Sequence, residues 1–182
     1  MGLVYWSLSC YIEGCQKPTN QDLWRKQMIR TFKPVLRDLW FREKLLSDEQ
    51  TMSYNAAWRG AIPFPKEEWE RWFSAWLEVS EYQRYYRYLY ETDTKAFVGE
   101  IAYHYDEQRK KYFCDVIVLA EYRNRGFGTA GIELICKAAK ENGIPVLYDD
   151  IAIGNPSYKL FLKNGFEIDY KDDDVVMVKK EL

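Results

Sequence analysis

The chain has 182 residues, of which 47% are hydrophobic and 30% charged, and its formal net charge at pH 7 is −2. This balance is typical of a folded globular protein, and the length suits one domain with a single sizeable core. The charge gives no support to nucleic-acid binding, and no apolar run approaches the ~20 residues that span a bilayer. We therefore expect one globular domain with neither a nucleic-acid nor a membrane partner.

The cysteines and the single histidine argue against a metal site. Cys10, Cys15, Cys114 and Cys136 lack the paired spacing of zinc ligands. We expect reduced thiols, no bound metal and a cytoplasmic location. The apolar stretch 3–12 follows no cationic segment, so we expect a first or edge strand there and not a signal peptide.

The first half of the chain is rich in tryptophan and predicts helices. Apolar residues at helical spacing predict three of them, over 21–32, 35–46 and 66–79. Pro34 and a proline-rich loop over 60–65 separate these segments. The third segment carries an aromatic stripe on one face, formed by Trp69, Trp72, Phe73 and Trp76. Such a stripe is typical of core or lid packing and not of catalysis.

From residue 82 onward, apolar and polar residues alternate as they do in strands. Three strands are predicted, over 85–91, 96–105 and 112–119, and the short turns between them favour antiparallel hairpins. The remaining predicted elements are a helix over 129–142, a strand over 145–151, a helix over 156–164 and a hairpin of 166–170 with 175–179.

The segment Arg123-Asn-Arg-Gly-Phe-Gly-Thr-Ala-Gly131 follows a strand and opens a helix. Glycines let the backbone approach a bulky anion, and the first amides of a helix lack partners within it and attract negative charge. Arg123 and Arg125 add fork-shaped donors that suit phosphate oxygens. The segment is therefore predicted to bind a pyrophosphate.

A dinucleotide-binding loop is the main alternative, because Gly126-Phe-Gly128-Thr-Ala-Gly131 satisfies G-x-G-x-x-G. That motif places its first glycine directly after the strand, whereas mostly polar residues separate Leu119 from Gly126 here. The strands before the loop are hairpin-connected, and about 50 residues follow it, too few for a second mononucleotide-binding half. A Walker loop is excluded, because no Gly-Lys-Ser/Thr follows the glycines. A glycine turn without a ligand is the remaining alternative.

The chain resembles the GNAT superfamily of N-acetyltransferases in two segments. The acyl-CoA loop of that family, R/Q-x-x-G-x-G/A, is matched by Arg123-Asn-Arg-Gly126-Phe-Gly128. Downstream, Asn155-Pro-Ser-Tyr-Lys-Leu-Phe-Leu-Lys-Asn-Gly-Phe166 is similar to the family's Asn…Leu-Tyr/Phe-x-Lys-x-Gly-Phe segment. The two matches occur in the family's order, one helix and one strand apart.

The resemblance implies an α/β (α+β) fold, in which helices flank a mixed, mostly antiparallel sheet with a splay between the strands ending at Leu119 and Ile151. A single domain over 1–182 would consist of a helical, acceptor-side section over 1–81 and a cofactor-binding core over 82–182. Acetyl-CoA would enter the splay, with its pantetheine near the backbone of 117–119 and its pyrophosphate on the amides of 125–129.

By the same resemblance, Asn155 matches a cofactor-binding asparagine of the family, although it lies one residue closer to Gly165 than usual. Its alternative role is that of a helix cap. The residues expected to bind acetyl-CoA are Ile117, Val118, Leu119, Arg123, Asn124, Arg125, Gly126, Phe127, Gly128, Thr129 and Asn155.

The implied reaction is direct transfer of an acetyl group from acetyl-CoA to a primary amine of a small molecule or a peptide terminus, in a ternary complex. The Val118 amide is expected to polarise the thioester carbonyl. Many family members carry Tyr where this chain has Phe161, so Tyr158, one helical turn earlier, is the expected proton donor to the sulfur, with packing as its alternative role.

The predicted base candidates are Asp115 and Glu100, with His104 also on a nearby strand. Each is alternatively a satisfied structural group, and a water relay is the other route for the proton. Asp149 and Asp150 are either solvated acids at a strand end or a feature that attracts a cationic amine. Two further functions are kept: an acyl-CoA sensor that transfers nothing, suggested by Phe161, and an NAD(P)-dependent oxidoreductase. Exposed aromatic strands suggest a homodimer.

Overall fold

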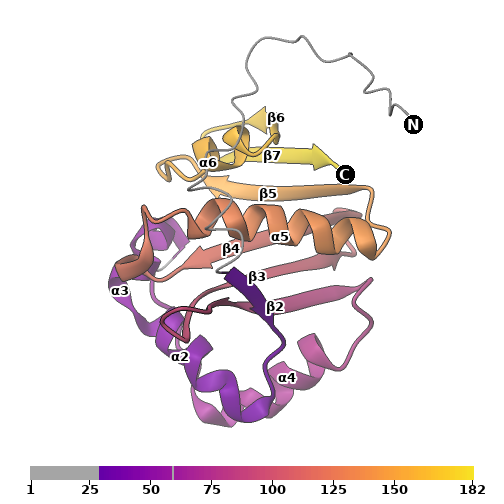
Figure 1. Cartoon of the computed structure of the whole chain (residues 1–182). Helices are drawn as coiled ribbons and strands as arrows, with labels where there is room; N and C mark the ends of the chain where they lie inside the picture. The colour runs from indigo at the N-terminus through magenta and orange to yellow at the C-terminus, as the bar shows by residue number, and fades with distance from the viewer. Residues whose placement is uncertain (1–28, 59) are drawn as a thin grey trace, which may run out of the picture.

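The computed structural model describes residues 29–58 and 60–182. Within them, seven strands form one sheet in the order β1-β2-β3-β4-β5-β7-β6 (Figure 1). Neighbouring strands are antiparallel except β4 and β5, which run parallel. The sheet is therefore mixed and mostly antiparallel, as the resemblance implied.

The strands are β1 (Ile29–Phe32), β2 (Arg84–Glu91), β3 (Ala96–Asp106), β4 (Lys111–Val118), β5 (Val146–Ala152), β6 (Glu167–Lys171) and β7 (Val175–Glu181). The α-helices are α2 (Trp40–Ser47), α3 (Glu49–Met52), α4 (Trp69–Leu77), α5 (Phe127–Glu141) and α6 (Tyr158–Lys163). Short 3-10 helices are η1 (Leu36–Leu39), η2 (Ser53–Trp58), η3 (Lys66–Glu68) and η4 (Ala120–Tyr122).

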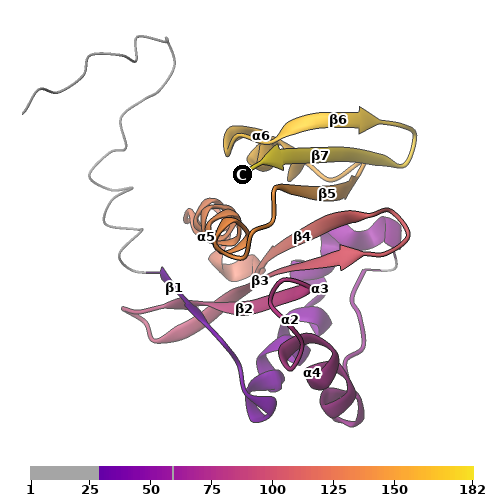
Figure 2. The same ribbon diagram turned by 90° about the vertical axis from the view of Figure 1, so that its right-hand side faces the viewer.

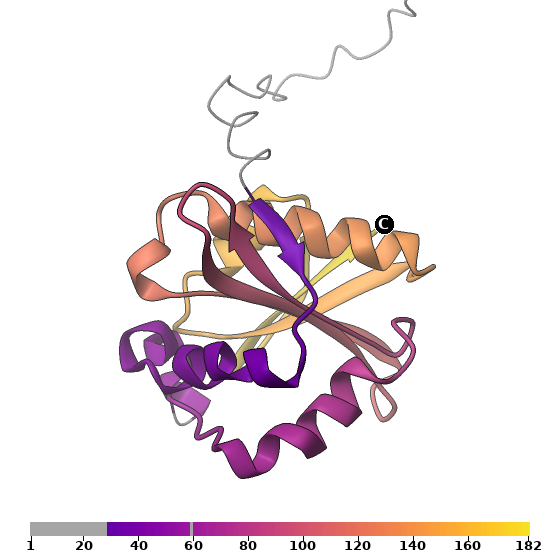
Figure 3. The same cartoon turned by 60° about the horizontal axis from the view of Figure 1, so that its bottom comes forward.

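Helices cover both faces of the sheet. Figure 2 shows α5 on one face and α2 and α4 on the other, and Figure 3 shows the same two layers from below. The period-two alternation of the strands divides the core accordingly: on β2, Tyr85 and Leu89 pack under α5, whereas Tyr86 and Tyr88 pack under the N-terminal helices. The fold thus has two apolar clusters separated by the sheet.

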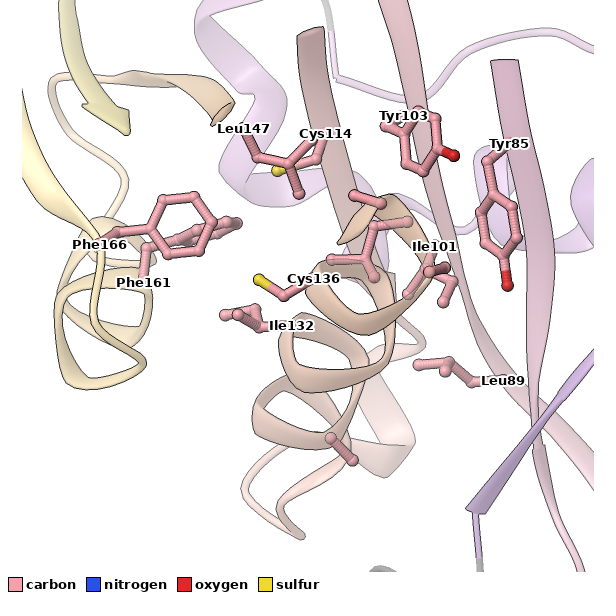
Figure 4. Packing of buried hydrophobic residues seen from close by; sticks show 14 of the residues in the cluster. Tyr85, Leu89, Ile101, Tyr103, Cys114, Ile132, Cys136, Leu147, Phe161 and Phe166 are labelled. Atoms are coloured by element: carbon pink, nitrogen blue, oxygen red, sulfur yellow. The ribbon is translucent and has the colours of Figure 1, made fainter. Parts of the chain in front are cut away.

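The cluster under α5 joins the helix to the C-terminal part of the sheet. Figure 4 shows Ile132 and Cys136 of α5 among the side chains of the strands, with Phe161 and Phe166 beside them. The cluster on the opposite face holds the aromatic stripe of α4, in which Trp69 is buried and Trp72 and Trp76 are partly buried. The predicted packing role is confirmed for the buried Trp69, while Trp72 and Trp76 pack on the cluster with part of their surface still exposed.

The prediction of a helix over 21–32 is wrong at its C-terminal end. Ile29–Phe32 forms β1 and pairs with β2, with Ile29 opposite Glu91 and Phe32 opposite Tyr88. The helical spacing of the apolar residues misled the prediction, because pairing with a sheet edge overrides local periodicity. Residues 21–28 lie outside the described part, as do the strand predicted over 3–12 and the residues Cys10 and Cys15.

Helix content elsewhere follows the sequence closely. The segment predicted over 35–46 forms η1 and α2, and that over 66–79 forms η3 and α4. Asp48 caps α3, where its carboxylate accepts hydrogen bonds from the amides of Gln50 and Thr51. Within the described residues, no helix is long and apolar enough to cross a membrane.

Strand β3 approaches β4 closely at Gly99. A Cβ added to Gly99 would lie 2.3 Å from the backbone oxygen of Ile117, which cannot rotate away. We expect Gly99→Ala to lower the free energy of unfolding by about 1–3 kcal/mol, because the strands must separate. Thermal denaturation of this variant, beside Gly154→Ala, whose added methyl meets no atom within 4 Å, measures the effect. Equal melting temperatures of the two variants would show that β4 moves away from the added methyl group without loss of stability.

Candidate functional site: a cavity in the splay between β4 and β5

Strands β4 and β5 pair over a short distance and then separate. Their register contains Tyr112 opposite Leu147 and Phe113 opposite Tyr148. Beyond that point the Leu119 amide donates to Val98 of the β3 side at 3.0 Å. Because successive amides of a strand point to opposite sides, the Val118 amide points away from β3, toward the gap left by β5. The splay is present where the resemblance placed it.

A cavity of about 790 Å³ lies in this splay. One end is lined by the β4 backbone, the glycine loop and α6, and contributes Ile117, Val118, Arg123, Asn124, Gly126, Gly128, Thr129, Asn155, Pro156, Ser157, Leu160 and Phe161. The other, acidic end is lined by aromatic and charged side chains, among them Arg42, Trp72, Trp76, Tyr86, Glu100, Asp115, Asp149 and Asp150, and Tyr54 also lines the cavity. Residues from both halves of the chain therefore meet in one site.

The glycine loop is shaped for close approach by a ligand. Asn124 and Gly126 have positive φ angles of 59° and 86°, so the chain turns sharply before α5 begins at Phe127. A Cβ on Gly128 would lie 2.8 Å from the terminal methyl of Leu160, so α5 and α6 approach each other closely beside the loop. The first α5 hydrogen bond runs from Ala130 to Gly126, which leaves the preceding amides available to an anion.

Both arginines of the loop already have protein partners. Arg123 donates to the backbone oxygens of Gln50 and Thr51, and its guanidinium lies 5.3 Å from the ring centroid of Tyr54. Arg125 forms an ion pair at 3.1 Å with the buried Glu91. Arg123 also lines the cavity, whereas Arg125, Phe127 and Leu119 are not among the lining residues. The structure thus offers an anion mainly backbone amides, because the guanidinium groups hold the loop in place.

A second anchor joins the loop to the N-terminal helices. The Ala120 amide donates to the hydroxyl of the fully buried Thr51 at 2.8 Å, and that hydroxyl donates to Asp48. The hydrogen bond from Thr51 lowers the pKa of the Asp48 carboxyl. The sequence contains no signal for this contact, because it joins segments far apart along the chain.

Asn155 lies just before α6 but is not its N-cap, which is Ser157, and its cofactor-binding role stays a prediction. Its side-chain oxygen accepts a hydrogen bond from the Ser157 amide at 2.9 Å, which organises the turn before α6. The residue is buried and lines the cavity. It therefore supports the start of α6 while facing the site.

At the acidic end, Glu100 is tied to two neighbours. The Arg42 guanidinium and the Tyr86 hydroxyl both donate to its carboxylate. The guanidinium lies 4.5 Å from the ring centroid of Trp72, and burial raises the pKa of the Tyr86 hydroxyl well above its ordinary value. Glu100 thus has the satisfied environment of a structural group, and the sequence did not indicate Arg42 as its partner.

Asp115 is in a different situation. Its carboxylate lines the cavity, on the same sheet face as Ile117, and forms no hydrogen bond or ion pair within the described residues. Its side chain is exposed to the cavity, and the protein atoms around the cavity limit its hydration. Burial, followed by repulsion from Glu100 and Asp150, raises the pKa of Asp115 to about 6. A carboxyl with this pKa is ionised at neutral pH and suited to accept a proton.

The tyrosines occupy different positions around the site. Tyr158 is not among the lining residues, and its ring packs against the apolar cluster under α5. Phe161 lines the cavity and carries no proton to donate. Tyr54, which the sequence did not single out, lines the cavity, and burial raises the pKa of its hydroxyl.

His104 does not line the cavity. Its ring lies 5.7 Å from that of Trp76 and burial lowers its pKa, so it remains neutral near pH 7. Within the described residues, no group of three or more His, Cys, Asp and Glu side chains is arranged to hold a metal ion. The chemistry of the site therefore rests on the cavity carboxylates, the tyrosines and the backbone amides.

Comparison with known proteins agrees with this geometry. Residues 42–166 match the model of the acetyltransferase (GNAT) family. No curated protein matches the chain. The fold is similar to that of spermidine N-acetyltransferase from Vibrio cholerae in complex with CoA and spermine, with a TM-score of 0.69, 15% identity, and 85% of this chain and 96% of that chain covered.

Two further solved structures share the fold. An N-acetyltransferase from Staphylococcus aureus Mu50 has a TM-score of 0.68 and 19% identity, with 85% of this chain and 97% of that chain covered. The PaiA N-acetyltransferase from Thermoplasma acidophilum, in complex with coenzyme A, has a TM-score of 0.60 and 15% identity, with 85% of this chain and 99% of that chain covered. Because the family model spans more than half of the sequence, the chain belongs to the acetyltransferase (GNAT) family, whose members use acetyl-CoA.

Proposed function

We propose that this chain transfers the acetyl group of acetyl-CoA to a primary amine of a small molecule or a peptide terminus, with both substrates bound in the cavity together. The observation that carries the proposal is the continuity of the cavity. One end presents helix-start amides and the other an unpaired carboxylate, with the open backbone edge of β4 between them.

Acetyl-CoA supplies the activated acyl group, and the residues at the glycine end fit its phosphates. The amides that follow Gly126 lie at the start of α5, where the helix dipole favours negative charge. The Val118 amide points toward the splay, and we keep the prediction that it donates to the thioester oxygen. Arg123, Asn124 and Asn155 line this end, and we retain them with Arg125, Phe127 and Leu119 as predicted cofactor residues.

Asp115 is the residue we propose as general base. An amine reacts only after it loses its proton, and among residues 29–58 and 60–182 the Asp115 carboxylate has no hydrogen-bond or ion-pair partner that would compete for it. Glu100 stays a predicted base, although Arg42 and Tyr86 occupy its carboxylate. The predicted homodimer and cytoplasmic location are not needed for this chemistry and also stay predictions.

An acyl-CoA sensor is the second candidate function, because Phe161 stands where many relatives carry a tyrosine. Acetyl-CoA should raise the melting temperature with increasing concentration, and NAD(P) should leave it unchanged. Release of free thiol from acetyl-CoA with a panel of primary amines then separates the two functions. Stabilisation by acetyl-CoA without thiol release for any amine would favour the sensor. Stabilisation by NAD(P) but not by acetyl-CoA would contradict both the acetyltransferase and the sensor.

The proton donor to the sulfur can be assigned by paired substitutions. We expect the tyrosine that donates to lower kcat by roughly 10- to 100-fold or more when replaced by Phe, because general acid catalysis contributes on this scale. Tyr158→Phe tests the residue predicted from the sequence, and Tyr54→Phe tests the tyrosine that lines the cavity. Tyr170→Phe, at an exposed position on β6, is the control. If kcat is unchanged in all three variants, water supplies the proton.

A further inference from the structure

The cavity contains four carboxylates, and two of them have counter-charges. Glu100 is paired with Arg42, and Asp150 forms an ion pair with Arg109 at 2.5 Å. Asp115 and Asp149 form no ion pair within the described residues. The neighbouring Asp150 amide only weakly favours the ionised form of Asp149, so most of the acceptor capacity of its carboxyl is free. The cavity therefore carries two carboxyl groups that lack a cation.

These two groups lie on the strands that diverge, Asp115 on β4 and Asp149 on β5. Burial, followed by repulsion from Asp115 and Asp150, raises the pKa of Asp149 well above its ordinary value. A raised pKa means that the carboxyl holds its proton more readily, and a cation placed between the strands would stabilise its ionised form. The ligand-free site thus has two carboxyl groups available to pair with a bound cation.

The surrounding walls favour an organic cation over a hydrated ion. Trp72, Trp76 and Tyr86 line the acidic end, together with the apolar side chains of Leu46, Met52 and Ile62. Aromatic faces and methyl groups pack against alkyl chains and attract ammonium groups, but they do not replace the water shell of a metal ion. No group of three suitable metal ligands occurs among the described residues.

We propose that the acceptor is a diamine, whose reacting amino group lies at Asp115 and whose second ammonium group pairs with Asp149. This inference rests on the proposed acetyl transfer and specifies its substrate class. The reacting amine gives its proton to Asp115 and becomes neutral, so it cannot also balance the charge of the second carboxylate. A separate ammonium group, joined through an alkyl chain that packs on the aromatic wall, satisfies both carboxyl groups at once.

The test compares pairs of acceptors that differ by one charge. α,ω-Diaminoalkanes of two to six carbons are assayed beside the monoamine and the amino alcohol of equal length. For the diamine that spans the two carboxyl groups, we expect kcat/KM to be about 10- to 100-fold higher, as one charge-assisted hydrogen bond provides. Asp149→Asn should reduce the ratio of the diamine kcat/KM to the monoamine kcat/KM toward one. Asp173→Asn, in the exposed β6–β7 turn, should leave that ratio unchanged.

A binding measurement separates this inference from the proposed reaction. In the presence of CoA, isothermal titration of the wild-type protein should detect the preferred diamine but not the matching monoamine, and Asp149→Asn should abolish the difference. Equal kcat/KM for all three acceptors, or an equal loss for all three in Asp149→Asn, would overturn the diamine proposal while acetyl transfer stands. Diamine binding without thiol release from any amine would instead contradict acetyl transfer alone.

Discussion

Asp115→Asn is expected to lower kcat by about 10²- to 10⁴-fold at neutral pH, because an amide cannot accept the proton of the incoming amine. The wild-type rate should fall as the pH decreases through about 6, where the raised pKa of Asp115 leaves the carboxyl protonated. Initial rates of thiol release between pH 5 and 8 measure both effects. The acetyl-CoA dissociation constant should stay unchanged, since Asp115 lies at the acidic end of the cavity.

The same substitution should not destabilise the fold. A carboxyl whose folded pKa lies above its unfolded value binds more protons in the folded state, so ionisation opposes folding. The loss of folding free energy caused by ionisation of Asp115 is absent below the ordinary Asp pKa of 3.8 and complete above about pH 6. Asp115→Asn should therefore melt at the same or a higher temperature at pH 7. Full activity of Asp115→Asn would exclude Asp115 as the base. A melting temperature of Asp115→Asn below that of the wild type would reveal a structural partner of the carboxylate.

Glu100→Ala is expected to lower the free energy of unfolding by about 3–5 kcal/mol, because it leaves the charge of Arg42 buried without its partner. The Tyr86 hydroxyl would lose its acceptor in the same step. Thermal and urea denaturation measure the loss. Glu121→Ala is the matched control, since its 3.5 Å ion pair with Lys44 is exposed on both sides and should contribute less than about 1 kcal/mol.

Two further variants distinguish a structural role of Glu100 from its predicted role as base. The double variant Arg42→Met with Glu100→Leu should recover part of the stability, because no charge is then left unpaired. Glu100→Gln keeps the shape of the side chain, so a stable variant with a much reduced kcat would support the predicted role as base. Equal stability of Glu100→Ala and Glu121→Ala would show that water reaches Arg42 and compensates its charge.

The second half of the fold was predictable because its signals are local. Alternating residues define β2, β3 and β4, and Gly143 and Pro145 end α5 where the sequence indicates. The glycine loop also depends on neighbours in sequence, since a positive φ at Gly126 and a helix start at Phe127 need no distant contact. The elements that hold the cofactor end therefore follow from short-range rules.

The site depends more on the tertiary structure. Arg123 and Arg125 match a phosphate-binding pattern, yet their guanidinium groups contact Thr51 and Glu91. Tyr158 lies at the predicted helix position but packs under α5, while Tyr54 lines the cavity. Ile29–Phe32 reads as helix and forms a strand, because the edge of β2 offers it hydrogen bonds.

By itself, the sequence determined the secondary structure from β2 onward, the shape of the glycine loop and the family. Only the tertiary structure decided which charges are paired. Asp115 and Asp149 are far apart along the chain and line one cavity because β4 and β5 pair just before them and then separate. Arg42 reaches Glu100 from α2, in the N-terminal half of the chain. Side-chain partners across a sheet depend on register and strand divergence, and these result from packing of the whole chain rather than from any local pattern.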